Sequence, residues 1–278
     1  MPRPAKSYDR LAGLTALVTG AGSVGESEDG GVGVGRAIST LFAREGAKVG
    51  LLDLDAERAE ITLRAIRGEG GEGMVLTGDV TDEADCAKAV AACAGRFGGI
   101  DILVNNVGIL TKGVRLEDTT ADNWRRGIDV NLNGAFLMTR AALPHLLASR
   151  GKAVVNIVSV AGIKAYSAPG YSAAKAGLIQ LARDLAFLYG PEGLRANAIA
   201  PGHILTPMVE GVLSDEDVDA RRRIQPLPIT GDAWDIAQAA VFLGSAEARL
   251  ITGVCLPVDG GSTSVGPLVA HQRFPKVS

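Results

Sequence analysis

Cysteine is scarce in this sequence, and neither sign of charge is in large excess. The three cysteines are an odd number without a CxxC pair, and Cys86 and Cys93 fall within a helical pattern. This usage suits a reducing compartment and predicts neither a disulfide framework nor a zinc site. The formal net charge of −3 also argues against a general attraction to nucleic acid or anionic membrane. We therefore expect no metal ion, no nucleic acid and no membrane as partners.

Long apolar segments are absent as well. No run approaches the ~18 residues of a membrane-spanning helix, and no apolar stretch follows Arg3 and Lys6 as it would in a signal peptide. A cytoplasmic location is the default expectation. The 278 residues are 47% hydrophobic, which is enough to fill a substantial core. Because no linker or repeat divides them, we predict one domain over residues 1–278.

Short aliphatic runs alternate along the chain with longer segments of helical periodicity. The runs interpreted as strands are residues 14–19, 48–53, 73–77, 102–105, 153–159, 196–200 and 254–258. Several are apolar nearly throughout, as expected for parallel strands covered on both faces. Between them, residues such as Ile38, Leu41 and Phe42 repeat at helical spacing. The alternation predicts an α/β fold with a doubly wound parallel sheet of seven strands and helices on both faces.

Two segments depart from this alternation. Residues 205–228 contain three prolines and an acidic patch, which indicates a short mobile helical excursion over the sheet edge, a candidate lid. The tail at residues 262–278 follows the last predicted strand. It could cross to a neighbouring subunit or be loose.

Glycines cluster after the first predicted strand in two groups. The first, Gly20 to Gly25, matches GxGxxG but runs into an acidic stretch, whereas Gly33 and Gly35 lead into a helical pattern. Glycine is favoured where backbone amides must approach a diphosphate at a helix N-terminus. We interpret Gly20 as a tight turn and Gly33 and Gly35 as phosphate contacts, with residues 23–31 bulging outward as an insertion. A glycine-rich surface loop without a ligand is the alternative.

Asp53 ends the second predicted strand. At this position a carboxylate can accept hydrogen bonds from adenosine ribose hydroxyls, and it would repel a 2′-phosphate. No arginine or lysine occurs at residues 54–56, nor between Gly20 and Gly35. The pattern favours NAD over NADP, although Asp53 could instead cap a helix beside Asp55.

A tyrosine and a lysine stand four residues apart, at Tyr171 and Lys175, with Ser159 upstream. On a helix, side chains at this spacing share a face about 5–6 Å apart, so the ammonium can favour ionisation of the phenol. Such a pair can transfer protons near neutral pH. Taken alone, the same pair also fits an ordinary amphipathic helix face.

Together and in this order, these motifs resemble the short-chain dehydrogenase/reductase family from about residue 14 to residue 261. The other matching motifs are Asp79-Val80, Asn105-Asn106-Val107-Gly108, Asn131, Pro201-Gly202 with Thr206, and Asp259-Gly260-Gly261. The resemblance implies a single-domain Rossmann-like fold that binds NAD. Two departures are the 23–31 insertion and Val107, where alanine is usual.

The resemblance also assigns roles to individual residues. It implies that Tyr171 is the acid/base, that Lys175 lowers its pKa and holds the nicotinamide ribose, and that Ser159 bonds the substrate oxygen. Asn131 would anchor a water of a proton relay. Outside the family pattern, Asn131 could simply kink a helix and Ser159 could cap a strand end. The expected cofactor contacts are Gly20, Gly33, Val34, Gly35, Asp53, Asp79, Val80, Asn105, Gly108, Tyr171, Lys175, Pro201, Gly202, Ile204 and Thr206.

The function that follows is NAD(H)-dependent oxidoreduction of a secondary alcohol and its ketone. Two alternatives remain: a dinucleotide-binding regulatory protein without turnover, and a non-redox reaction on the same scaffold. The substrate pocket is expected to be moderately apolar and to take an uncharged compound. Its expected residues are Ile163, Tyr166, Met208, Val212 and Leu213.

Three further features allow more than one role: the arginines at 221–223, His203, and two helices that could join subunits. The run of arginines at 221–223 is either a solvated helix face or a site for an anionic substrate tail, and His203 either touches substrate or lies in a loop. By resemblance, a homotetramer would form through helices near residues 120–148 and 170–189. Its candidate contacts, which would fit the core equally well, are Phe136, Leu137, Phe187 and Leu188.

Overall fold

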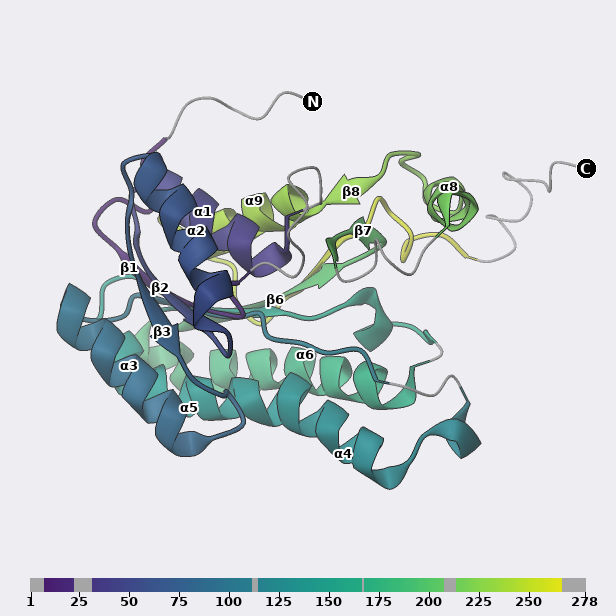
Figure 1. Cartoon of the computed structure of the whole chain (residues 1–278), viewed down its shortest axis with the longest axis horizontal. Helices are drawn as coiled ribbons and strands as arrows, with labels where there is room; N and C mark the ends of the chain where they lie inside the picture. Colours follow the sequence, from purple (N-terminus) through teal and green to yellow (C-terminus); the bar gives the residue numbers. More distant parts are fainter. Residues whose placement is uncertain (1–7, 23–31, 112–114, 167, 208–213, 267–278) are drawn as a thin grey trace, which may run out of the picture.

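The computed structural model describes residues 8–22, 32–111, 115–166, 168–207 and 214–266. Seven strands form one parallel sheet in the order β3-β2-β1-β4-β5-β6-β9 (Figure 1). These strands are β1 (Thr15–Thr19), β2 (Lys48–Asp53), β3 (Glu72–Thr77), β4 (Ile102–Asn105), β5 (Ala153–Ile157), β6 (Arg195–Pro201) and β9 (Cys255–Val258). The predicted doubly wound α/β sheet is confirmed, and the largest error in a strand end is two residues, at β5.

Helices cover both faces of the sheet. The α-helices are α1 (Val34–Arg44), α2 (Ala56–Gly68), α3 (Glu83–Phe97), α4 (Ala121–Ile128), α5 (Gly134–Ala148), α6 (Pro169–Tyr189), α8 (Asp215–Arg223) and α9 (Ala233–Gly244). Short turns are the 3-10 helices η1 (Leu116–Asp118), η3 (Val160–Gly162), η4 (Gly190–Glu192) and η5 (Ala246–Ala248), and the π-helical η2 (Asp129–Asn133). Every residue of β1, β4 and β5 is buried, as their continuous apolar sequences predict.

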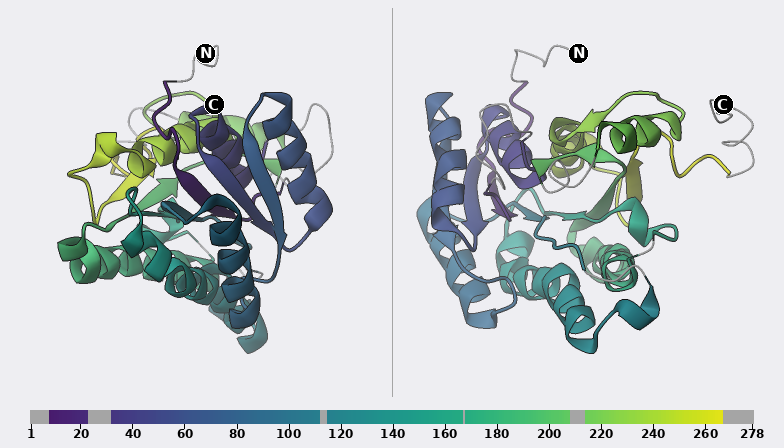
Figure 2. Two further views of the ribbon diagram at one scale, coloured as in Figure 1. Left: turned by 90° about the vertical axis from the view of Figure 1, so that its left-hand side faces the viewer. Right: turned by 45° about the vertical axis from the view of Figure 1, so that its right-hand side comes forward.

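The two helical layers form separate cores. Helices α1, α2 and α9 pack on one face around Phe42 and Ile236, while α3, α5 and α6 pack on the other around Val90 and Met138 (Figures 1 and 2). The chain therefore leaves β1 toward one face and β4 toward the other, although the two strands are neighbours. In a doubly wound sheet, a crevice for ligands opens where the strand order reverses in this way.

A small second sheet lies beyond the predicted elements. Strands β7 (Ile204–Leu205) and β8 (Gly231–Asp232) pair in parallel, and α8 lies between them in the sequence, where the helical excursion was expected. Ser214 and Asp217 form a capping box that starts α8. The 23–31 insertion, the pocket residues Met208, Val212 and Leu213, and the chain beyond residue 266 lie outside the described residues.

Cys86 and Cys93 are buried, as expected. Burial raises the pKa of the Cys86 thiol to about 11 and that of Cys93 to about 12, so both stay protonated and inert at neutral pH. Within the described ranges, no helix combines the length and apolar character required to cross a membrane.

Candidate active site

A crevice of about 380 Å³ opens at the carboxyl ends of the central strands. Its volume is in the range of small-molecule and cofactor sites. The predicted site residues that line it are Gly20, Gly33, Val34, Gly35, Asp53, Asp79, Val80, Gly108, Ser159, Tyr171, Lys175, Pro201, Gly202, Ile204 and Thr206. Two others, Asn105 and Asn131, are not part of its wall. Tertiary structure thus brings together residues that lie between positions 20 and 206 of the sequence.

The glycine loop makes a close backbone cradle at one end of the crevice. Gly20 has φ +65°, a left-handed conformation that favours glycine. A Cβ on Gly35 would lie 1.9 Å from the Gly20 carbonyl oxygen, so only glycine fits there. Gly33 precedes α1 without a side-chain cap, whereas Asp55 and Asp82 cap α2 and α3. The N–H groups in the first turn of α1 have no side-chain partner in the part of the chain that the structure describes and therefore suit a diphosphate.

Asn106 holds this cradle in place. Its Nδ2 donates to the carbonyl oxygens of Thr19 and Gly20, both at 3.0 Å, and its backbone N–H donates to Thr19 Oγ1 at 3.0 Å. The sequence prediction chose Asn105 as the cofactor contact instead. Asn105 is buried and donates to Thr139 Oγ1 at 3.0 Å and Asn156 Oδ1 at 2.9 Å, so its side chain braces β4 against β5 and α5. Alternation along the strand end was the signal that could have separated the two asparagines.

Asp53 faces the crevice with its carboxylate held by backbone amides. Oδ2 accepts from Gly22 N at 2.8 Å and Oδ1 from Asp55 N at 3.1 Å. Asp55, rather than Asp53, caps α2 through Glu57 N and Arg58 N, which removes the alternative role considered for Asp53. The nearby Arg58 lies 3.2 Å from the Asp55 carboxylate, so its charge is already engaged.

Further along the crevice, Asp79 and Val80 lie beyond the end of β3. The Asp79 carboxylate accepts from Thr81 N at 2.8 Å and Thr81 Oγ1 at 2.7 Å. The backbone bond from Thr81 is the largest cause of the lowered pKa of Asp79, and the positive charge of Arg126 adds to it. Arg126, from α4, lines the same end of the crevice and was not predicted, because nothing in its local sequence marks it.

Tyr171 and Lys175 lie on the first turns of α6, where Lys175 Nζ is 5.7 Å from the centre of the Tyr171 ring. Lys175 is almost fully buried, and its Nζ donates to the Ile157 carbonyl oxygen at 2.9 Å. Among the described residues, no side chain caps the N-terminus of α6 at Ala168. Thr111 Oγ1 instead accepts from Tyr171 N at 3.3 Å, so the loop after β4 fixes the start of the helix that carries both residues.

Burial dominates the ionisation of the pair. It raises the pKa of Tyr171, and the hydrogen bond with the Ser159 side chain only partly opposes this. Burial also lowers the pKa of Lys175 to about 8. The sequence predicts that Lys175 lowers the tyrosine pKa, whereas the net direction in the structure is a rise caused by burial. The physical reason is that desolvation disfavours the charged form of both groups.

Ser159 caps a turn and lies beside Tyr171. Its Oγ accepts from Ala161 N at 3.1 Å and so caps η3 after β5, and the same side chain bonds to that of Tyr171. A single serine thus fixes the turn and orients the phenol.

Asn131 lies in the π-helical turn η2 between α4 and α5 and is fully buried. Its Nδ2 donates to the carbonyl oxygens of Ile109 (3.1 Å) and Gly127 (2.9 Å), and its Oδ1 accepts from Ile109 N at 2.9 Å. The whole side-chain amide is therefore committed to backbone. A π-turn leaves backbone carbonyls without regular helical partners, so any relay through Asn131 would use its main chain.

Gly108 lies close to both Asn131 and Lys175 of α6. A Cβ there would lie 3.0 Å from Asn131 Oδ1 and 3.2 Å from Lys175 Nζ. The tight approach places the asparagine turn directly behind the ammonium group.

Comparison with known proteins gives the family. The family model described as Enoyl-(Acyl carrier protein) reductase matches residues 30–263. The crystal structure of a Burkholderia xenovorans protein assigned to the short-chain dehydrogenase/reductases is 40% identical with a TM-score of 0.85, covering 92% of this chain and 99% of that one. This chain is a short-chain dehydrogenase/reductase.

Two further relatives of this short-chain dehydrogenase/reductase carry specific names. Cis-4-hydroxycyclohexanecarboxylate dehydrogenase of Sinomonas cyclohexanicum is 37% identical over 258 residues, which are 92% of this chain and 99% of the relative. Carveol dehydrogenase of Mycobacterium avium, solved in complex with NAD, is 32% identical with a TM-score of 0.84, covering 92% of this chain and 99% of that one. The family predicted from the motifs is confirmed.

Proposed function

We propose that the protein is an NAD(H)-dependent oxidoreductase that interconverts a secondary alcohol and its ketone, with Tyr171 as acid/base. The observation that carries the proposal is the meeting of Tyr171, Ser159 and buried Lys175 at one wall of a crevice whose other end is a glycine cradle. Relatives named as dehydrogenases support oxidoreduction at a CH–OH group. One of those names contains a hydroxycyclohexane ring, which favours an alicyclic alcohol.

The bound nicotinamide dinucleotide supplies the hydride chemistry. Tyr171 takes the hydroxyl proton of the alcohol, or returns it to the ketone oxygen, in the role of general base or acid. Ser159 lies beside the phenol and donates to the same substrate oxygen. Because Ser159 caps η3, its side chain is already held in that position. It therefore needs little further ordering when the substrate reacts.

Lys175 provides the positive charge that opposes the effect of burial on Tyr171. Its pKa of about 8 leaves it mostly protonated at neutral pH, within 5.7 Å of the tyrosine ring. A nearby cation favours tyrosinate, and the charge of an oxidised nicotinamide would act in the same direction. The phenol would thus ionise readily only in the loaded site.

NAD rather than NADP is the proposed cofactor. Asp53 places a carboxylate at the end of β2, where the adenosine ribose would lie, and its negative charge would oppose a 2′-phosphate. The nearest cation, Arg58, is paired with Asp55. A relative solved with NAD is consistent with this choice.

Several wider features remain proposals. One catalytic domain with a lid at residues 205–228 and a cytoplasmic location follow from the sequence pattern, and a homotetramer follows from the family resemblance. On α5 and α6, Phe136, Phe187 and Leu188 are 46%, 82% and 59% exposed, which supports a subunit interface there. Leu137, in contrast, packs against the core. Sedimentation should show a single species of four times the chain mass. A species with the mass of one chain would refute the tetramer.

A panel of alicyclic secondary alcohols and ketones, assayed with NAD and with NADP by absorbance of the reduced cofactor, tests the function. We expect turnover with NAD. Tyr171→Phe should lower kcat by at least about 10²-fold, the usual range for a general acid/base, while NADH binding followed by fluorescence stays within about twofold because the ring is kept. Turnover like wild type in this variant would rule out the tyrosine mechanism. Cofactor binding without turnover of any substrate would favour the regulatory alternative.

A further inference from the structure

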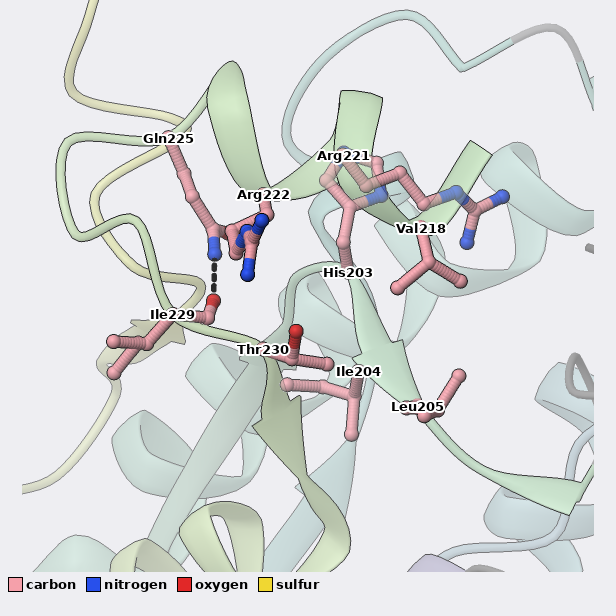
Figure 3. A pocket seen from close by; sticks show the side chains of 9 residues that line it. All are labelled: His203, Ile204, Leu205, Val218, Arg221, Arg222, Gln225, Ile229 and Thr230. Carbon is pink, nitrogen blue, oxygen red and sulfur yellow. Dashed lines mark hydrogen bonds between the residues drawn. The ribbon is translucent and has the colours of Figure 1, made fainter. Parts of the chain in front are cut away.

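A second, smaller hollow is lined by residues of β7, of α8 and of the segment that follows α8 (Figure 3). The side chains of α8 form its upper wall in this view, and Ile204 and Leu205 of β7 form its base. The enclosed space is about 10 Å³, roughly that of one water-sized group. The hollow therefore suits the end of a substituent rather than a whole ligand.

The polar groups around this hollow are mainly cationic or uncharged. Arg221, Arg222 and His203 line it, with Gln225 and Thr230. Arg222 forms an ion pair with Asp219, as does Arg223, whereas Arg221 has no such pair among the described residues. Gln225 is already bonded to the Ile229 carbonyl oxygen (Figure 3). The guanidinium of Arg221 is thus the charge available to a ligand.

His203 has a buried ring nitrogen that no described residue bonds. Its ring extends toward the start of the Arg221 side chain (Figure 3), and its Nδ1 is buried with no partner among the described residues. Buried polar atoms of this kind normally find a partner. Burial lowers the pKa of His203, the positive charges of Arg221 and Lys164 add to this, and only Asp259 opposes it. An anion between the imidazole and the arginine would satisfy both groups.

The hollow adjoins the crevice that Tyr171 lines. Ile204 lines both spaces. The rings of His203 and Tyr166 are 6.1 Å apart, and Tyr166 is close enough to Tyr171 to raise its pKa through charge interaction. Tyr166 is thus a common neighbour of His203 and Tyr171.

We propose that His203 and Arg221 form a subsite for a carboxylate carried on the alcohol or ketone substrate, remote from the reacting carbon. The inference rests on the proposed function and names its substrate class as hydroxy acids and oxo acids. Arginine is suited to this role because its planar guanidinium donates two parallel hydrogen bonds to a carboxylate. The uncharged substrate expected from the sequence is replaced by an anionic one, and the apolar residue Ile204 lies where the ring would pass.

Binding of two unreactive probes of the same size separates the carboxylate from the ring. Cyclohexanecarboxylate and cyclohexanecarboxamide are titrated by calorimetry into the protein alone and into the protein saturated with NADH. We expect wild type to bind the acid at least about tenfold more tightly than the amide, the usual scale for a hydrogen bond to a charged group.

Arg221→Gln should remove that preference and leave amide binding within twofold. Arg223→Gln is the matched control, because Arg223 is on the same helix but is paired with Asp219 and does not line the hollow. It should leave both affinities unchanged. In His203→Gln the side chain can still donate and accept hydrogen bonds. This substitution should therefore weaken binding of the acid less than Arg221→Gln does.

The outcomes separate the two proposals. Equal affinities of wild type for acid and amide, or equal losses for both probes in Arg221→Gln, would overturn the subsite. If wild type prefers the acid and this preference depends on Arg221, the subsite is supported. If in addition no alcohol is oxidised, only the proposed function is refuted.

Discussion

Replacing Lys175 with methionine should make the folded protein more stable while removing its activity. The side chain is only 3% exposed, and Nζ has one hydrogen-bond acceptor in the structure, the Ile157 carbonyl oxygen at 2.9 Å. Methionine has a similar length and no charge, so it can fill the same space without an ammonium group. The ammonium destabilises the fold because it has lost most of its hydration.

The size of this effect follows from the pKa. Burial lowers the pKa of Lys175 from 10.5 to about 8, and since one pKa unit is about 1.4 kcal/mol, the charged form costs roughly 3 kcal/mol at neutral pH. Methionine would leave the Ile157 carbonyl without its donor, at about 1–3 kcal/mol. The net expectation is a gain in the free energy of unfolding of about 0–2 kcal/mol at pH 7.

The sign of the pH dependence is fixed by the same shift. Below about pH 8 both the folded and the unfolded protein hold the proton of Lys175, so the full cost is present. Between about 8 and 10.5 only the unfolded state still holds it, and stability due to this group rises with pH. The advantage of Lys175→Met over wild type should therefore shrink steadily across this window.

Urea unfolding at pH 7, 8.5 and 10 measures the free energy of unfolding of Lys175→Met and of wild type. Subtracting one from the other cancels the contributions of the other groups that titrate in this range. Lys88→Met on α3 is the control, because Lys88 is exposed and surface changes are usually within about 0.5 kcal/mol. Lower stability of Lys175→Met than of wild type at pH 7, or a difference that does not vary with pH, would refute the account of the buried ammonium.

Two other substitutions test the cofactor end. Asp53→Ala removes the carboxylate that would repel a 2′-phosphate, so the ratio of kcat/KM for NAD over NADP should fall by at least about tenfold; an unchanged ratio would mean that another residue sets the preference. Gly35→Ala places a Cβ 1.9 Å from the Gly20 carbonyl oxygen, which the backbone cannot relieve, so NADH affinity should fall about tenfold or more and the melting temperature should drop. Gly68→Ala has open space around its Cβ and should change neither quantity; a Gly35→Ala protein that behaves like it would contradict the described cradle.

Much of the fold could be predicted because its signals are local. The continuous apolar runs of β4 and β5 and the helical spacing of Ile38, Leu41 and Phe42 specify element type without reference to the rest of the chain. The glycine, Asp53 and Tyr171 motifs have fixed spacings, so their identities were also readable. Strands β7 and β8 were missed, since two residues each are too short to show periodicity and exist only through their pairing.

The candidate site was predictable in its membership but not in its details. Alternation along the strand indicates that Asn105 and Asn106 point to opposite sides, but only the packed sheet shows which of them braces the core and which holds the glycine turn. Arg126 has no motif and joins the crevice only when α4 is packed in place. The commitment of the Asn131 amide to backbone depends on the π-turn.

By itself, the amino-acid sequence determined the order of strands and helices and the residue types available for proton transfer and dinucleotide binding, since these follow from short-range patterns. Tertiary structure alone decided the electrostatics. Burial, which depends on every element packed around α6, raises the pKa of Tyr171 and lowers that of Lys175. It also decided that Arg221 and His203, apart in the sequence, face one hollow beside the catalytic wall, because side-chain surroundings are set by packing between distant segments.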